Sequence, residues 1–184
     1  MTKHSATSAT AMPGCDSFAA ALFTPEPSEK IGSGVLLRLP EEVSAGLPSR
    51  GMVSVEGTIN GAPFRAVFEP DGRGSHWCQV TEALRAAANA DVGDTVTLAI
   101  APTTDWPEPT VPTDLARALA ATPSARALWR AITPLARWDW IRWIGATRSP
   151  QTRQRRVAVA IDKLDAGKRR PCCFDRNQCT LTDA

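Results

Sequence analysis

Tryptophan and arginine side chains are concentrated between Arg137 and Arg156, where three of the chain's six tryptophans lie among closely spaced arginines. Indole rings stack on nucleobases and guanidinium groups neutralise phosphates, so binding of single-stranded nucleic acid requires a composition of this kind. The first hypothesis for this stretch is therefore a nucleic-acid interface. Its candidate residues are Trp138, Arg142, Arg148, Arg153, Arg155 and Arg156.

A helical core explains most of the same stretch. On a helix that begins near Pro134, steps of about 100° per residue place Trp140 and Trp143 on one apolar arc. Trp138 and Arg142 fall on the opposite side. The following helix has a matching apolar stripe, formed by Val157, Ala160, Ile161 and Leu164. We therefore favour two packed amphipathic helices with solvated arginines outside them, and nucleic-acid binding remains the alternative.

Cysteines are a second source of chemistry, since Cys172, Cys173 and Cys179 lie close together near the end of the chain. A structural zinc site needs four well-spaced ligands, and adjacent cysteines are awkward partners for one ion. The total of five cysteines is odd and scattered, which fits reduced thiols better than a disulfide framework. We expect ordinary thiols here, with metal binding or redox sensitivity as weaker possibilities, and we expect no cofactor.

His76 and the glycine-containing segment before it, PDGRGS, carry two further interpretations. A catalytic histidine needs a nucleophile or carboxylate beside it, and spacing identifies none, so His76 is expected to be a structural hydrogen-bonding residue. Asp71, Gly72 and Gly74 lack the lysine and the following helix of a phosphate-binding loop. These residues are expected to form a hairpin turn.

Charge is distributed unequally along the 184 residues. Residues 1–125 contain 8 basic and 14 acidic side chains, a balance of −6, whereas residues 126–170 contain 12 basic and 3 acidic ones, a balance of +9. A basic half fits an acidic partner such as nucleic acid, but it fits equally an attraction between the two halves of the chain. Because neither a long apolar run nor a secretory signal is found, we expect a cytoplasmic protein without membrane insertion.

The elements that must position these residues begin with a small β-barrel, expected over residues 16–104 after a tail at 1–15. The strongest signal is Asn60-Gly61, typical of a type I′ turn, which pairs Gly57 with Phe64 and Val53 with Phe68. Further strands are expected at 17–23, 33–39, 75–80 and 93–101, with a short helix at 81–90. Five or six short strands favour closure, which removes exposed edges.

A helical domain is expected over residues 112–170, after a proline-rich linker at 105–111 and before a cysteine-containing tail at 171–184. Thr122-Pro123, Thr133-Pro134 and Ser149-Pro150 each place a capping hydroxyl before a proline at the first helical position. A further helix is expected near 112–121. The predicted fold class is therefore α+β, with a closed or double-split barrel followed by a small helical domain.

Two pairs of stretches each resemble a known family. VEGTINGAPFRAVFEPDGRGSHW and the ALRAAANADVGDTVTLAI that follows resemble the bacterial domain-of-unknown-function family nineteen-oh-five, a small β-barrel. VPTDLARALAATPSARALWRAI and the later RWIGATRSPQTRQRRVAVAIDKLDAGKRRPCC resemble the helical domain of the YdeI/OmpD-associated, or bacteriocin-protection, family. The resemblance implies a bacterial protein linked to bacteriocin tolerance or envelope stress, without an assigned activity.

The sequence is compatible with three functions. The leading expectation is a non-enzymatic protein that acts by binding an unknown protein or small molecule. The first alternative is a nucleic-acid-binding or regulatory protein that uses the basic helical domain. The second alternative is a small-ligand binder or an enzyme whose site lies between the domains, where pockets often form.

Overall fold

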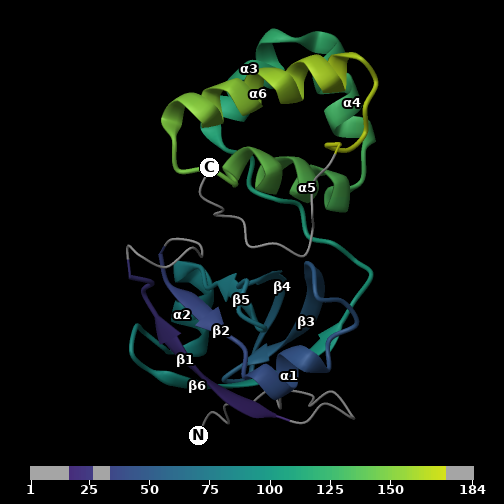
Figure 1. Ribbon diagram of the computed structural model, residues 1–184. Helices are drawn as coiled ribbons and strands as arrows, with labels where there is room; N and C mark the ends of the chain where they lie inside the picture. The colour runs from purple at the N-terminus through teal and green to yellow at the C-terminus, as the bar shows by residue number, and fades with distance from the viewer. Residues whose placement is uncertain (1–16, 27–33, 173–184) are drawn as a thin grey trace, which may run out of the picture.

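The computed structural model describes residues 17–26 and 34–172, which form a β-barrel followed by a group of helices (Figure 1). The barrel is closed, so the predicted α+β class is confirmed in its closed form. In Figure 1 the helices stand above the barrel, and α5 is the helix nearest to it. Among the described residues no helix is both long and apolar enough to cross a membrane.

The barrel contains six antiparallel strands in the order β1-β2-β5-β4-β3-β6, and β1 pairs with β6 to close it. Leu22, Val55, Phe68 and Leu98 fill its interior and are almost completely buried. Two short helices cover parts of the barrel. The element bounds are β1 Phe18–Phe23, β2 Leu36–Arg38, α1 Glu41–Ala45, β3 Val53–Ile59, β4 Ala62–Pro70, β5 His76–Gln79, α2 Glu82–Ala88 and β6 Thr95–Pro102.

The β3–β4 hairpin has the predicted register. Asn60 and Gly61 adopt φ values of 47° and 83°, and Gly57 lies opposite Phe64. The glycine at position 57 is required by a neighbouring strand rather than by the Phe64 ring opposite it. A Cβ atom on Gly57 would lie 2.0 Å from the Ala99 carbonyl oxygen of β6, so the close approach of a neighbouring backbone excludes a side chain.

The helical domain consists of α3 Thr113–Ala121, α4 Pro123–Ala131, α5 Pro134–Gly145 and α6 Pro150–Asp165. The hydroxyls of Thr133 and Ser149 accept hydrogen bonds from the backbone at the start of α5 and α6, as predicted. Thr122 makes no such side-chain bond. It is shared between two helices, since it ends α3 and also precedes α4, and its N–H donates to the Leu119 carbonyl.

The helical domain has its own core, separate from that of the barrel. Trp140 and Ile144 of α5 are fully buried against Leu115 of α3 and Leu164 of α6. Trp143 is partly buried and meets the Trp140 ring edge-on, with centroids 5.9 Å apart. The predicted packing of α5 on α6 is therefore present, and two of the three clustered tryptophans belong to this core.

Candidate functional site between the domains

Arg142 lies on the face of α5 that is turned toward the barrel. Its side chain is only 2% exposed, and its Nε donates to Oε2 of Glu69 on β4 at 2.8 Å. The expectation that Arg142 lies on a solvated basic face is therefore corrected. The helical periodicity was right, but α5 is covered on both sides, by the helical core on one and by the barrel on the other.

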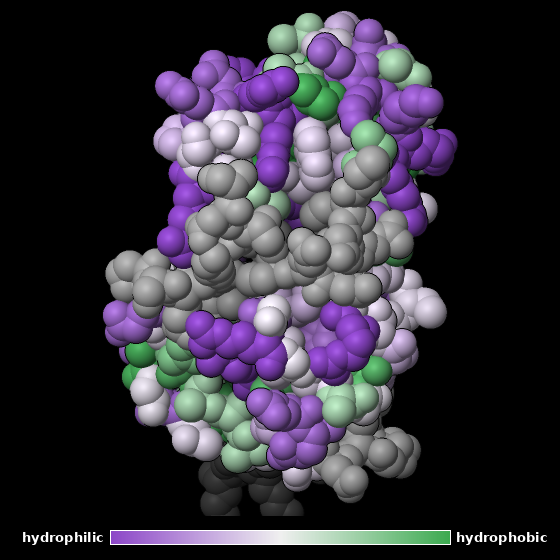
Figure 2. Space-filling view, viewed as in Figure 1, coloured by the Kyte–Doolittle hydropathy of each residue, from purple (hydrophilic) through white to green (hydrophobic). Residues whose placement is uncertain are grey.

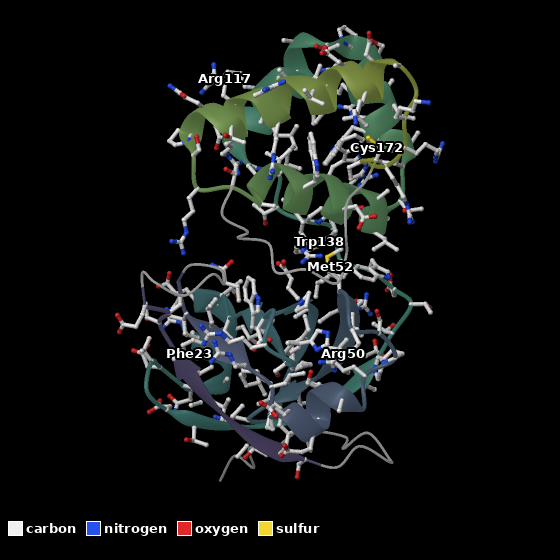
Figure 3. All side chains as sticks on the ribbon, in the orientation of Figure 1. Phe23, Arg50, Met52, Arg117, Trp138 and Cys172 are labelled. Carbon is white, nitrogen blue, oxygen red and sulfur yellow. The ribbon has the colours of Figure 1, made fainter. Side chains whose placement is uncertain are left out.

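Trp138 also extends from α5 toward the barrel (Figure 3). Its indole N–H donates to the Pro107 carbonyl of the linker at 2.8 Å, and the ring stays partly exposed. Next to it, Arg137 binds the Trp129 and Ile132 carbonyls at 2.9 Å each and forms an ion pair with Glu108. The linker is thus bound to the start of α5 by a hydrogen bond and an ion pair, and the hydrogen bond to Pro107 fixes the orientation of Trp138.

These contacts enclose a cleft of about 360 Å³ between the two domains. One wall comes from strands β4 and β5, and the opposite wall comes from the linker and α5. The volume is near the lower end of the range of about 300–1,000 Å³ that small-molecule pockets occupy. The lining residues are Arg65, Ala66, Val67, Glu69, Trp77, Gln79, Thr81, Pro107, Glu108, Thr110 and Trp138.

Each charged side chain of the cleft has an oppositely charged partner. Arg65 lies 3.3 Å from Glu56 and also pairs with Asp105. Glu69 is bound to Arg142, and Glu108 to Arg137. The cleft therefore has mixed polarity but little net charge, and the ion pairs fix its walls.

Trp77 lines the cleft and has a hydrogen-bond donor whose bonding capacity is not met by the described residues. Its neighbour Cys78 belongs to the barrel core, so the alternation of side chains along β5 places Trp77 on the outer face, where it packs with Leu36 and is only 5% exposed. Its indole N–H is buried, and nothing in residues 17–26 and 34–172 accepts a hydrogen bond from it. A buried donor without an acceptor costs on the order of 1–3 kcal/mol, so this one calls for an explanation.

The remaining candidate arginines of the nucleic-acid hypothesis differ in their contacts and exposure. Arg153 holds Asp114 of α3 through two hydrogen bonds of 2.7 and 3.0 Å, and this partner lowers the pKa of the Asp114 carboxyl. Arg156 donates to the Trp143 and Ala146 carbonyls at the end of α5. Arg148 and Arg155 are exposed. Hydrophilic side chains cover much of the helical domain in Figure 2.

His76 is completely buried and joins three segments of the barrel. Its Nε2 donates to the Gly51 carbonyl at 2.8 Å, since a carbonyl only accepts, so Nδ1 is the acceptor for the Ser44 hydroxyl at 2.7 Å. Burial lowers the pKa of His76, which favours this neutral form. Sequence spacing did not identify Ser44, but no substrate reaches a pair that is 0% exposed, so the role of His76 is structural.

The turn before His76 is also structural. Asp71 accepts hydrogen bonds from the backbone N–H groups of Arg73 and Ser75 at 2.8 and 2.9 Å. The carboxylate thus binds backbone N–H groups of its own turn. The predicted hairpin turn is present between β4 and β5.

Of the candidate metal-binding thiols, only Cys172 lies within the described residues; Cys173 and Cys179 lie outside them. Lys163 Nζ donates to Cys172 Sγ at 2.6 Å. The part of the chain that the structure describes contains no cluster of three or more His, Cys, Asp or Glu side chains suited to a metal ion. Cys78 is buried in the barrel core, and burial raises the pKa of its thiol.

The fold defines a two-domain protein in which a closed barrel and a helical domain enclose a small cleft. Residues 18–100 match the family model described as a domain of unknown function, DUF1905. Residues 108–167 match the model described as "Bacteriocin-protection, YdeI or OmpD-Associated". The barrel of this chain is thus similar to the DUF1905 domain, and its helical domain is similar to the YdeI or OmpD-associated, bacteriocin-protection family. No curated protein matches the chain.

Proposed function

We propose that this chain is a non-enzymatic, cytoplasmic binding protein that holds a small molecule in the cleft between its barrel and its helical domain. The observation that carries the proposal is the cleft itself, which has a volume of about 360 Å³ and tryptophan side chains on both walls. Aromatic surface combined with a small number of placed polar groups is typical of small-molecule sites, and this cleft has both. The description of the matched family, bacteriocin protection, is compatible with a protein that acts by binding.

The contacts of the charged groups support binding rather than catalysis. Glu69 and Glu108 are each engaged in an ion pair with an arginine. Both carboxylates thus connect elements of the fold, whereas a general acid or base has to lie within hydrogen-bond reach of the proton that it transfers. We therefore propose that these groups shape the cleft and position its walls.

A fragment screen by protein-observed NMR tests this function. The six tryptophans give indole N–H signals that single Trp→Phe variants can assign. We expect small molecules to shift the signals of Trp77 and Trp138 together. Thr110→Trp, which adds a ring at an exposed position of the lining, should abolish those shifts. Hits that leave both signals unchanged, or that persist in Thr110→Trp, would contradict the proposal.

Nucleic-acid binding is the second candidate, favoured by the exposed basic side chains of the helical domain. Of the residues assigned to it from the sequence, Arg148 and Arg155 are exposed, and further exposed residues are Arg117, Arg126, Arg130, Arg169 and Arg170. Phosphate contacts release counterions, so affinity should fall steeply with added salt. Labelled single- and double-stranded DNA and RNA are titrated at low salt. Absence of binding below about 100 μM, weaker than much non-specific association, discards this candidate.

A further inference from the structure

We infer that the cleft accepts an uncharged, planar ring system with a hydrogen-bond acceptor, and that the indole N–H of Trp77 donates to this acceptor. The inference rests on the proposed binding function and adds the chemical class of the ligand. It combines three observations about the cleft: a buried donor without an acceptor, aromatic walls on both domains, and charged groups that already have partners.

The donor is the first observation. The Trp77 Nε1 atom is buried, yet residues 17–26 and 34–172 supply no acceptor for it. Trp138, the other indole of the lining, already donates to the Pro107 carbonyl. Indole nitrogen is a donor and never an acceptor, so the complementary ligand atom is a carbonyl oxygen or an unprotonated ring nitrogen. A ligand acceptor at Trp77 would remove the cost of an unmade hydrogen bond.

The shape of the walls is the second observation. Trp77 comes from β5 and Trp138 from α5, so each domain contributes one indole ring to the same small cavity. Val67 and Pro107 add further apolar surface. Aromatic rings pack against such walls by offset stacking or edge-to-face contact, which adds specific geometry to simple burial. A cavity of about 360 Å³ with this lining suits a ring system of one or two fused rings.

Charge is the third observation, and it favours a neutral ligand over an ionic one. Among the described residues that line the cleft, Arg65 is the one cation, and its guanidinium lies between Glu56 and Asp105. A phosphate or carboxylate ligand would have to displace one of these acids or bind without a cation. Glu69 and Glu108 are likewise occupied by arginines, so a cationic ligand gains no free acid. Placing a charge in the cleft without a partner costs free energy, and a neutral ligand avoids this cost.

Three probes of similar size separate these properties: coumarin is planar, neutral and has a carbonyl acceptor; naphthalene is planar and has none; 2-naphthoate is an anion. Binding is followed by the indole N–H shifts of the full chain. We expect coumarin to bind about tenfold more tightly than naphthalene, the ratio that one net hydrogen bond gives. We expect 2-naphthoate to bind more weakly than coumarin.

Trp77→Phe keeps an aromatic ring and removes the donor. It should reduce coumarin affinity by about tenfold and leave naphthalene affinity unchanged, so that the two probes bind alike. Trp143→Phe is the matched control, because Trp143 belongs to the helical core and not to the cleft. It should preserve the difference between the probes. Thermal unfolding of both variants verifies that each remains folded during the titrations.

The outcomes distinguish this inference from the proposed function. If coumarin and naphthalene bind the cleft equally, if Trp77→Phe leaves their ratio unchanged, or if 2-naphthoate binds most tightly, the assigned ligand class is wrong while binding in the cleft stands. If neither these probes nor any member of the fragment library shifts the Trp77 and Trp138 signals, the proposed function itself is overturned.

Discussion

Arg142 of α5 and Glu69 of β4 form a buried ion pair that joins the two domains, with a distance of 2.8 Å between Nε and Oε2. The two residues are 73 positions apart in the sequence, and both side chains are largely shielded from solvent, at 2% and 13% exposure. The basic half of the chain thus meets the acidic half at a specific contact. Salt screens a buried pair much less than an exposed one.

Removal of one partner of this pair should destabilise the protein more than removal of both. Arg142→Met removes the arginine that pairs with the largely buried Glu69, and breaking a buried pair in this way costs about 3–5 kcal/mol. The double variant Glu69→Leu, Arg142→Met should recover much of that loss, since apolar replacements of similar volume are often tolerated. Urea unfolding measures both, and X-ray scattering reports whether the domains separate. Equal losses in the single and double variants would contradict the coupling.

Gly57→Ala should destabilise the barrel by about 1–3 kcal/mol, because the new methyl group would meet the Ala99 carbonyl and force β3 and β6 apart. Gly46→Ala is the matched control: its added Cβ would lie at an ordinary contact distance of 3.5 Å from the nearest atom. It should change the free energy of unfolding by less than about 0.5 kcal/mol. Urea unfolding of both variants tests the difference, and comparable losses would rule out the backbone clash.

Stability should decrease as the pH falls below 6.5, the ordinary pKa of the His76 imidazole. Above that pH the side chain is neutral in the folded and the unfolded chain. Below it the unfolded chain binds a proton that the folded chain resists, because burial lowers the pKa of His76 in the fold. The loss therefore grows until the pH reaches the folded-state pKa.

Urea unfolding between about pH 8 and pH 5 measures this dependence. His76→Gln serves as the reference, since it removes the titrating group; it should be less stable than the parent at the upper pH but have a flatter profile. His76 is the sole histidine in the described ranges, so carboxylates are the other groups that titrate toward the acidic end. Parallel profiles for the two proteins would refute the assignment.

Adjacent arginines of α6 should respond differently to truncation. Arg156→Ala removes the donor to the Trp143 and Ala146 carbonyls, at 2.9 and 2.6 Å, and should cost about 1.5–3 kcal/mol, as for other charged hydrogen bonds. Arg155 is exposed, so Arg155→Ala should stay within about 0.5 kcal/mol. Thermal or urea unfolding makes the comparison. A larger effect at Arg155 would mean that the roles of these side chains are assigned incorrectly.

Local signals predicted the parts of the fold that depend on neighbours in the sequence. The Asn60-Gly61 turn fixed the β3–β4 register because two residues with positive φ permit only one tight hairpin. Thr133 and Ser149 marked the starts of α5 and α6 through their side-chain oxygens. By contrast, β2 has only three residues, and its pairing with β5 depends on long-range contacts that no short pattern encodes.

The candidate site was less predictable, because it depends on how two separately folded parts meet. Helical periodicity separated Trp138 and Arg142 from the core face of α5, yet it gave no information that the barrel would cover them. Trp77 is the exception, because side chains alternate along a strand: with Cys78 in the barrel core, Trp77 must lie on the outer face of β5. Only the structure brings this outer face opposite α5.

Closure of the barrel by its first and last strands also has a consequence for synthesis on the ribosome. Phe18 to Ala21 pair with Thr95 to Leu98, so β1 lacks this partner until some 80 further residues have been translated, at roughly 5–20 residues per second. During those seconds β1 presents an open edge to other chains. The helices α3 to α6 all lie within residues 113–165, so their contacts span shorter sequence distances than the pairing of β1 with β6. The nascent barrel is therefore the stage at which chaperone binding would matter most for this protein.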